Sequence, residues 1–253
     1  MAIVPGWHYP RYVAHRGGGV LAPENTLAGM RAAQAHGYAG VEFDVMLAAD
    51  GVPVLMHDPE FGRTIAGRGA VALTPSEVLV RLDAGAWKGE AFVGEPVPLF
   101  ADAAYWLIQA GIWMNVEIKP APGYEIVTGR VTAEYTARAW ARREPGTPAS
   151  PAPLLSSFSE DALRAAAAAR PELARAMLWQ RVPADWLARV RDLGCVAVHC
   201  DHRRLDAPTA RAIKAAGYGL MCYTVNEPAR AQEIFAWGVD AICTDRLDLF
   251  AGR

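Results

Sequence analysis

Short apolar runs alternate with helical stretches along the whole chain, and this pattern constrains the fold more than any other feature. Most runs are continuous rather than alternating in polarity, as expected of strands covered on both faces. Such an alternation predicts βαβ units and a parallel sheet. A barrel of eight units takes about 250 residues, and the chain has 253. We therefore predict a (β/α)8 barrel over residues 1–253 as one domain. Nine runs are candidate strands: Tyr12–His15, Gly40–Val45, Val52–His57, Ile112–Glu117, Pro153–Ser157, Ala174–Trp179, Val196–His199, Gly219–Val225 and Val239–Thr244.

Two segments break the alternation. Only seven residues, 46–52, join the second and third runs, whereas a parallel crossover needs about a dozen or more. We expect a tight turn around Asp50-Gly51, so that one of the nine runs is an extension or a lid. Residues 58–98 are rich in Gly and Pro, with one weak helical pattern over 75–82. Because long loops in compact domains are often functional, we expect a small cap-like insertion there, after the third strand and over the barrel mouth.

Several helices have recognisable ends. One is expected over residues 24–36. Asp206 is expected to cap a second helix that ends at Gly217, and Asn226 a third that ends at Gly238.

Composition excludes several classes of partner. With a net charge of −2 and 21% charged residues, the chain lacks the basic field that nucleic acid or an anionic membrane requires. It has no apolar run of the ~18 to 20 residues that a membrane span needs, and its first residues do not resemble a signal peptide. Its four cysteines form no C-x-x-C pair. We expect a cytoplasmic protein with a small-molecule substrate, no nucleic-acid partner and no membrane insertion; no oligomeric state is predicted.

Three acidic residues in strand positions suggest a metal site. Glu42 and Asp44 are two residues apart on one run, so both project to the same face, and Glu117 and Lys119 repeat this spacing on another run. Burying such charges unpaired is costly, whereas the carboxyl ends of barrel strands host catalysis. Three carboxylates without Cys or His suit Mg²⁺, Mn²⁺ or Ca²⁺. Salt bridging at the rim is the alternative.

Two histidines and two cations could complete an active site. His15 and His57 each end a predicted strand and could act as a general acid and base. The glycines at 17–19 allow a turn that brings Arg16 to the same cavity as His15. Arg16 and Lys119 would then hold a phosphate. His199 and His202 with Asp201 could form a second metal site, but we favour a histidine pair at the rim.

Six segments together resemble the glycerophosphodiester phosphodiesterase family, in its bacterial cytosolic type, and they occur in the family's order. They are HRGGGVLAPENT (15–26), VEFDVMLAADGVPVLMHD (41–58), NVEIKP (115–120), SSFS (156–159), YTVNE (223–227) and AICTD (241–245).

The resemblance implies a barrel with a small insertion and an enzyme of lipid and glycerol metabolism. It implies that one divalent cation, Mg²⁺ or Ca²⁺, is bound by Glu42, Asp44 and Glu117. It further implies acid–base roles for His15 and His57 and phosphate contacts from Arg16 and Lys119. Glu24 and Asn25 would lie at the site rim and stabilise the loop after the first strand.

The implied reaction hydrolyses a glycerophosphodiester, such as glycerophosphocholine or glycerophosphoethanolamine, to sn-glycerol 3-phosphate and an alcohol through a cyclic phosphate. Tyr223 stands where family members often have Trp, which affects an aromatic wall of the pocket. Phospholipase D-type barrels of spider venoms and a non-catalytic phosphate-binding barrel are the rival readings. The first usually has disulfides and a signal peptide, and the second should lack one of the site residues, all of which are present here.

Overall fold

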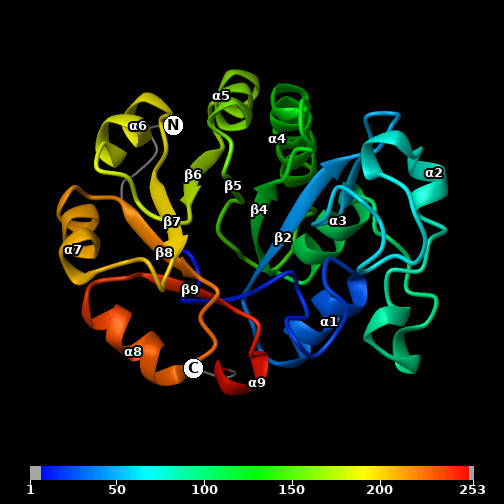
Figure 1. The fold of residues 1–253 in the computed structure, drawn as a ribbon, viewed down its shortest axis with the longest axis horizontal. Coiled ribbons are helices and arrows are strands. Elements are labelled where there is room, and N and C mark those ends of the chain that lie inside the picture. Colours follow the sequence, from blue (N-terminus) through cyan, green and yellow to red (C-terminus); the bar gives the residue numbers. More distant parts are fainter. Residues whose placement is uncertain (1–6, 251–253) are drawn as a thin grey trace.

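The structure is a computed structural model and describes residues 7–250. Eight parallel strands form a closed barrel, because β1 pairs with β9 on one side and with β2 on the other. The predicted fold is confirmed (Figure 1). The barrel strands are β1 (Tyr12–Ala14), β2 (Gly40–Leu47), β4 (Trp113–Ile118), β5 (Leu154–Ser157), β6 (Ala174–Trp179), β7 (Ala197–Asp201), β8 (Gly219–Tyr223) and β9 (Ala241–Thr244).

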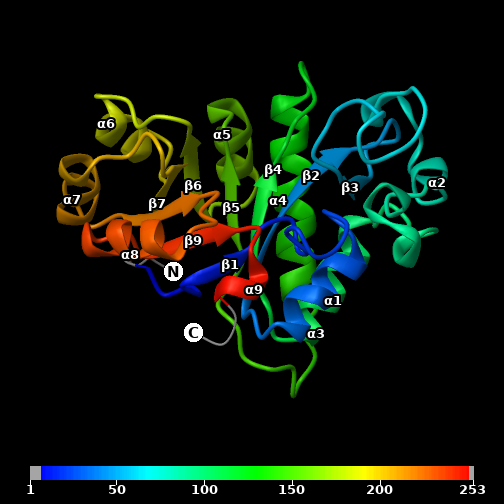
Figure 2. The same cartoon turned by 60° about the horizontal axis from the view of Figure 1, so that its bottom comes forward.

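Helices surround the barrel and cover the outer face of its strands (Figures 1 and 2). They are α1 (Leu27–Ala35), α3 (Phe100–Gln109), α4 (Glu125–Ala141), α5 (Glu160–Ala169), α6 (Trp186–Asp192), α7 (Ala207–Ala215), α8 (Pro228–Ala236) and α9 (Leu247–Phe250). Within residues 7–250, none of the helices combines the length and the apolar character that crossing a bilayer requires.

The ninth candidate strand extends the sheet and is not part of the barrel. β3 (Pro53–Leu55) pairs antiparallel with β2, with Val45 opposite Leu55. The expected tight turn joins the two strands, and Gly51 in it has a φ of 76°, a conformation that glycine adopts without a steric penalty.

Residues 58–98 form a small subdomain at the far end of this hairpin, beside the tip of the β2 arrow in Figure 2. Their regular elements are short: 3-10 turns at Val71–Leu73, Ala86–Lys88 and Glu90–Phe92, and α2 (Ser76–Leu79). They have a separate apolar cluster, in which Ile65, Val71 and Leu79 pack with Met46 of β2 and Val54 of β3. The segment is thus held by its own hydrophobic contacts with the hairpin.

Alternation along each strand separates two cores. Val41, Phe43 and Val45 of β2 belong to the large cluster between sheet and helices. Trp113 and Leu154 belong to a second cluster that fills the lower interior of the barrel. Because Glu42 and Asp44 alternate with the outward residues, they project to the barrel interior. The pleat therefore fixes the direction of both carboxylates.

Helix ends differ from the sequence prediction in two places. α1 begins at Leu27, not at residue 24, because Thr26 is the N-cap and its Oγ1 accepts a hydrogen bond from the Gly29 N–H at 3.0 Å. Asp206 caps α7 as predicted. Asn226, however, does not cap α8, whose N-cap is Glu227 without a side-chain cap bond.

Candidate active site

One cavity of about 670 Å³ lies at the carboxyl ends of the barrel strands and gathers the predicted site residues. Six of the seven line it: His15, Arg16, Glu42, His57, Glu117 and Lys119. The seventh, Asp44, is only 1% exposed and contacts the cations of the site. Chain segments from β1 to the loop after β4 are therefore brought to one place.

The three predicted metal ligands converge. Asp44 lies directly opposite Glu117 in the β2–β4 pairing, and Glu42 is one inward position earlier on β2. One carboxylate oxygen of each residue lies within 4.8 Å of the other two, and all three side chains are buried. Among the residues that the structure describes, this is the one such acidic group.

Burial and mutual repulsion shift the ionisation of these acids. Burial and the charge of Asp44 raise the pKa of Glu42 to about 8, and the same causes raise the pKa of Glu117. Burial would also raise the pKa of Asp44, but Lys119 and Arg16 lower it to about 2. Crowding of like charges in a buried site is what a bound divalent cation would relieve, and hard carboxylate oxygens are the donors such a cation prefers.

Arg16 and Lys119 are both held by site carboxylates. Lys119 Nζ lies 2.9 Å from Glu117 Oε1 and 3.5 Å from Asp44 Oδ1. Arg16 Nη1 donates to Glu24 Oε1 at 2.8 Å, and its Nε lies 3.5 Å from Asp44 Oδ2. Each cation is thus fixed in position and retains N–H groups for an anion in the cavity.

The loop after β1 aims His15 and Arg16 into the same cavity. Arg16 has a φ of 49° and the following Gly17 a φ of 79°, so the chain turns at once instead of continuing as a strand. The Arg16 backbone N–H donates to Glu42 Oε2 at 3.0 Å. This turn brings neighbouring side chains, which would face opposite sides of a strand, to one site.

Asn25 stabilises the loop after β1 from a buried position and does not lie at the rim, where it was expected. It is 3% exposed. Its Nδ2 donates to Asp44 Oδ2 at 2.9 Å, and its Oδ1 accepts from the Asp44 backbone N–H at 3.0 Å. Its own N–H donates to the Arg16 carbonyl at 2.9 Å. Through these hydrogen bonds, Asn25 fixes the loop after β1 to strand β2.

Each histidine ring is hydrogen-bonded through Nδ1 to an aspartate carboxylate. His15 Nδ1 lies 2.6 Å from Asp245 Oδ1, just after β9, and His57 Nδ1 lies 2.6 Å from Asp58 Oδ1. A carboxylate can only accept a hydrogen bond, so each Nδ1 carries a proton and each Nε2 is left for the substrate. His15 Nε2 lies 3.9 Å from Glu42 Oε2.

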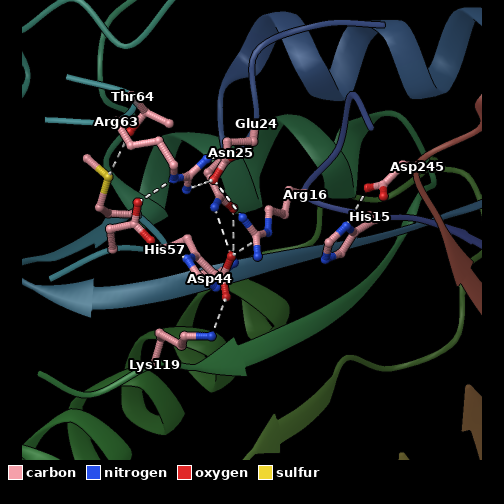
Figure 3. Close-up of polar contacts among 12 residues, drawn as sticks. His15, Arg16, Glu24, Asn25, Asp44, His57, Arg63, Thr64, Lys119 and Asp245 are labelled. Carbon is pink, nitrogen blue, oxygen red and sulfur yellow. Dashed lines mark hydrogen bonds and ion pairs between the residues drawn. The ribbon is translucent and has the colours of Figure 1, made fainter. Parts of the chain in front are cut away.

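Two further residues position these carboxylates. Asn226 Nδ2 donates to Asp245 Oδ2 at 3.1 Å, and Asn226 Oδ1 accepts from the Asp245 backbone N–H at 2.8 Å. This contact replaces the helix cap expected of Asn226. Arg63 Nε donates to Asp58 Oδ2 at 2.5 Å. Figure 3 shows Arg63 beside Glu24, and His15 beside Asp245.

No role was predicted from sequence for Asp58, Asp245 or Arg63. Asp58 and Asp245 end two of the segments that resemble the family, so their place in the blocks was a usable signal. Arg63 lies outside all six blocks, and only the folded chain brings it to the site.

The environments of the two histidines differ. Burial would lower the pKa of His15, but its hydrogen bond with Asp245 and the charge of Glu42 raise it. For His57, burial lowers the pKa, and Arg16 and Lys119 oppose the raising effect of Asp44. Such opposed environments are typical of an acid–base pair.

Residues of the loop after β5, of the later strands and of the loops that follow them line the other side of the cavity. The favoured histidine pair at the rim is wrong, because His199 is wholly buried. The alternative, a second metal site, does not form among the described residues either, since the Asp201 carboxylate binds Arg203. The lining residues there are Phe158, Leu178, Gln180, His202, Arg203, Tyr223, Thr224 and Asn226. Tyr223, expected in an aromatic wall of the pocket, lines the cavity together with Phe158.

Comparison with known proteins agrees with this geometry. Residues 15–249 match the glycerophosphoryl diester phosphodiesterase family. A glycerophosphodiester phosphodiesterase of Caldanaerobacter subterraneus is 29% identical over 92% of this chain and 93% of its own. The structure of an Oleispira antarctica phosphodiesterase in complex with the product sn-glycerol-3-phosphate superimposes with a TM-score of 0.86 at 37% identity, covering 94% of this chain and 93% of that one. An Agrobacterium tumefaciens glycerophosphodiester phosphodiesterase gives 0.78 at 27% identity, covering 96% and 99%.

Proposed function

This chain belongs to the glycerophosphoryl diester phosphodiesterase family, and from that premise we propose that it hydrolyses glycerophosphodiesters to sn-glycerol 3-phosphate and an alcohol. The observation that carries the proposal is the convergence of three buried carboxylates, two cations and two carboxylate-backed histidines on one cavity. The Oleispira antarctica relative, whose structure contains the product sn-glycerol-3-phosphate, supports the choice of product.

Glu42, Asp44 and Glu117 would bind one divalent cation, Mg²⁺ or Ca²⁺. The fit rests on their buried all-oxygen donor set and on the raised pKa of Glu42 and Glu117. A further oxygen, Asn115 Oδ1, is buried beside them without a hydrogen-bond partner among the described residues. When bound, such a cation polarises a phosphoryl oxygen and lowers the pKa of a hydroxyl that it contacts.

Arg16 and Lys119 would hold the phosphate, since each retains N–H donors after pairing with the acids around it. Their positive charge also favours the negative charge that develops on the phosphoryl oxygens. Because Glu24, Asp44 and Glu117 fix both side chains before substrate arrives, little of the binding free energy is needed to orient them.

His15 and His57 would exchange protons with the substrate through their Nε2 atoms. One takes the proton of the glycerol 2-hydroxyl as that oxygen attacks phosphorus, and the other protonates the leaving alcohol oxygen. The product of this step is a cyclic phosphate. In the second step the roles reverse: water loses a proton, opens the ring, and the 2-hydroxyl regains its hydrogen.

Residues 58–98 would act as a cap beside the mouth. Their separate apolar cluster and the bonds from Arg63 to Asp58 and Glu24 support this. A cap of this kind limits which substrates reach the histidines.

The test is an assay of metal-stripped protein against a panel of glycerophosphodiesters. We expect no turnover after chelation, recovery with added Mg²⁺ or Ca²⁺, and sn-glycerol 3-phosphate as the product. Full activity of protein shown by elemental analysis to be free of metal would contradict the metal assignment. Failure to hydrolyse any member of the panel with either cation would contradict the function itself.

A further inference from the structure

One part of the cavity has no role in the proposed chemistry. It lies under the loops that follow β5 to β8, and its polar and aromatic lining consists of Phe158, Gln180, His202, Arg203, Tyr223 and Thr224. This inference rests on the proposed function, with the attacking glycerol 2-hydroxyl as the hydroxyl that contacts the cation of the Glu42, Asp44 and Glu117 cluster. The other substituent on phosphorus, the alcohol, must then extend toward this second part.

This part of the cavity offers no free negative charge. Within residues 7–250, the carboxylates that line the cavity are Glu42 and Glu117, both in the metal cluster. Asp201, at the end of β7, accepts three hydrogen bonds from Arg203: from its backbone N–H at 2.9 Å, Nε at 3.0 Å and Nη2 at 2.8 Å. The Asp201 charge is therefore compensated before any ligand enters.

The aromatic side chains do not form a site for a cation either. Phe158 and Tyr223 meet edge to face, with ring centroids 5.9 Å apart. Lys119 Nζ already lies 5.7 Å from the Phe158 ring centroid, so a second cation on that face would be repelled by it. Quaternary ammonium ligands such as choline are usually bound by an aromatic cage, and here one face of the pair is taken by an ammonium group of the protein.

Hydrogen-bond donors dominate instead. Arg203 uses two of its five guanidinium N–H groups on Asp201, which leaves three for a ligand. The His202 ring is engaged by the protein, since its Nδ1 accepts a hydrogen bond from Arg230 Nε at 3.3 Å, and it offers no carboxylate to an ammonium group. The Gln180 amide can both donate and accept. This set suits hydroxyl groups.

We propose that the enzyme selects glycerophosphodiesters whose alcohol is an uncharged polyol, such as glycerol or inositol, over esters of choline or ethanolamine. Arg203 is the specificity-determining residue, because its guanidinium donates to hydroxyls and neutralises the Asp201 carboxylate that would otherwise attract an ammonium group.

The experiment measures kcat/KM of the metal-loaded enzyme for glycerophosphoglycerol, glycerophosphoinositol, glycerophosphocholine and glycerophosphoethanolamine. We expect the polyol esters to be favoured by about tenfold or more, and Arg203→Ala to lower kcat/KM for them by about tenfold, as expected for a lost hydrogen bond from a charged group. The choline ester should be unaffected or improve, since Asp201 is then free to attract it. Arg203→Glu should reverse the preference.

Arg204→Ala is the matched control. Arg204 is the next residue and also approaches Asp201, at 4.0 Å, but it does not line the cavity. Its removal should leave the ratio between polyol and choline esters unchanged. Circular dichroism and the melting temperature check that each variant is folded.

Two results would overturn the inference while leaving the proposed function standing. One is a wild-type enzyme that hydrolyses the choline ester as well as the polyol esters or better. The other is an Arg203→Ala variant that loses activity equally on all four substrates. A wild-type enzyme inactive on the whole panel would instead refute the proposed function, and this inference with it.

Discussion

Arg63 and Glu24 form a bidentate ion pair: Arg63 Nη1 and Nη2 donate to Glu24 Oε2 and Oε1 at 2.6 and 2.7 Å. Through its Nε, Arg63 also donates to Asp58. Glu24 contacts Arg16, and Asp58 contacts His57. A residue of the 58–98 subdomain thus connects Arg16, the proposed phosphate-binding arginine, with His57, one of the two proposed acid–base histidines (Figure 3).

Arg63→Ala should therefore reduce activity without unfolding the protein. The Arg63 side chain is 45% exposed, so its ion pairs should add no more than about 1 kcal/mol to stability. Loss of the contact that orients Asp58 should lower kcat/KM by about tenfold, because a misplaced supporting group weakens acid–base catalysis. Steady-state kinetics and thermal unfolding measure the two effects. Arg68→Ala, at an exposed arginine of the same segment, is the control; equal losses in both variants would argue against the link.

Replacing either histidine should cost about 10² to 10⁴-fold in kcat, as expected for lost acid–base catalysis. A p-nitrophenyl ester of glycerol phosphate separates the roles, because p-nitrophenolate leaves without protonation. We expect one of His15→Ala and His57→Ala to regain most of its rate of p-nitrophenolate release in the first turnover, which identifies the acid of the first step. If the ester rescues neither variant, or both, the two histidines do not act as an acid–base pair.

The glycerol 2-hydroxyl should be the nucleophile. Within residues 7–250, neither histidine ring is hydrogen-bonded to a Ser or Cys side chain that could serve as a protein nucleophile; the ring partners are Asp245 and Asp58, each on Nδ1. An internal hydroxyl has an effective concentration on the order of 10⁵ M or more when well oriented. An analogue of glycerophosphocholine with hydrogen in place of the 2-hydroxyl should bind and lose about 10³-fold or more in kcat. Turnover within a few-fold of the parent would mean that water attacks directly.

Binding of the divalent cation should release a proton from Glu42. Its pKa is raised to about 8 in the metal-free protein, so at neutral pH the carboxyl is mostly protonated and must ionise to bind metal. Affinity should rise by up to about tenfold per pH unit below pH 8 and level off above it. Calorimetric titration with Ca²⁺ in buffers of different ionisation enthalpy counts the protons. An identical heat in every buffer near neutral pH would contradict the prediction.

His199 should make the fold sensitive to acid. It is wholly buried, and neither ring nitrogen has a hydrogen-bond partner among the described residues. Burial lowers its pKa from 6.5 to about 3. Between these values the unfolded chain binds a proton that the native chain does not, so stability falls as the pH falls below about 6.5.

At pH 5 this one group should cost about 2 kcal/mol relative to pH 8. His199→Leu should remove that loss, as measured by urea unfolding at the two pH values. His8→Leu, at an exposed position, is the control and should keep the wild-type dependence. A His199→Leu variant that is as acid-sensitive as the wild type would show that other groups are responsible.

Local patterns in the sequence were enough to predict the barrel and to select seven candidate site residues, which the fold brings together at one cavity. The continuous apolar runs predicted buried parallel strands. The two-residue spacing of Glu42 and Asp44 predicted that both carboxylates lie on one face of the strand, because the pleat has a period of two. The short connection around Gly51 correctly indicated a turn. These are consequences of backbone geometry, which acts over a few residues.

Tertiary structure alone decided which groups support the chemistry. Asn226 has the sequence signature of a helix cap, yet its side chain binds Asp245, because the closed barrel brings β9 beside the loop after β8. Asn25, expected at the rim, is buried against Asp44. Arg63 belongs to no motif and reaches Glu24 across 39 residues of chain. Hydrogen bonds depend on the distance between side chains in space, and no local pattern encodes a distance that only the packing of the whole chain sets.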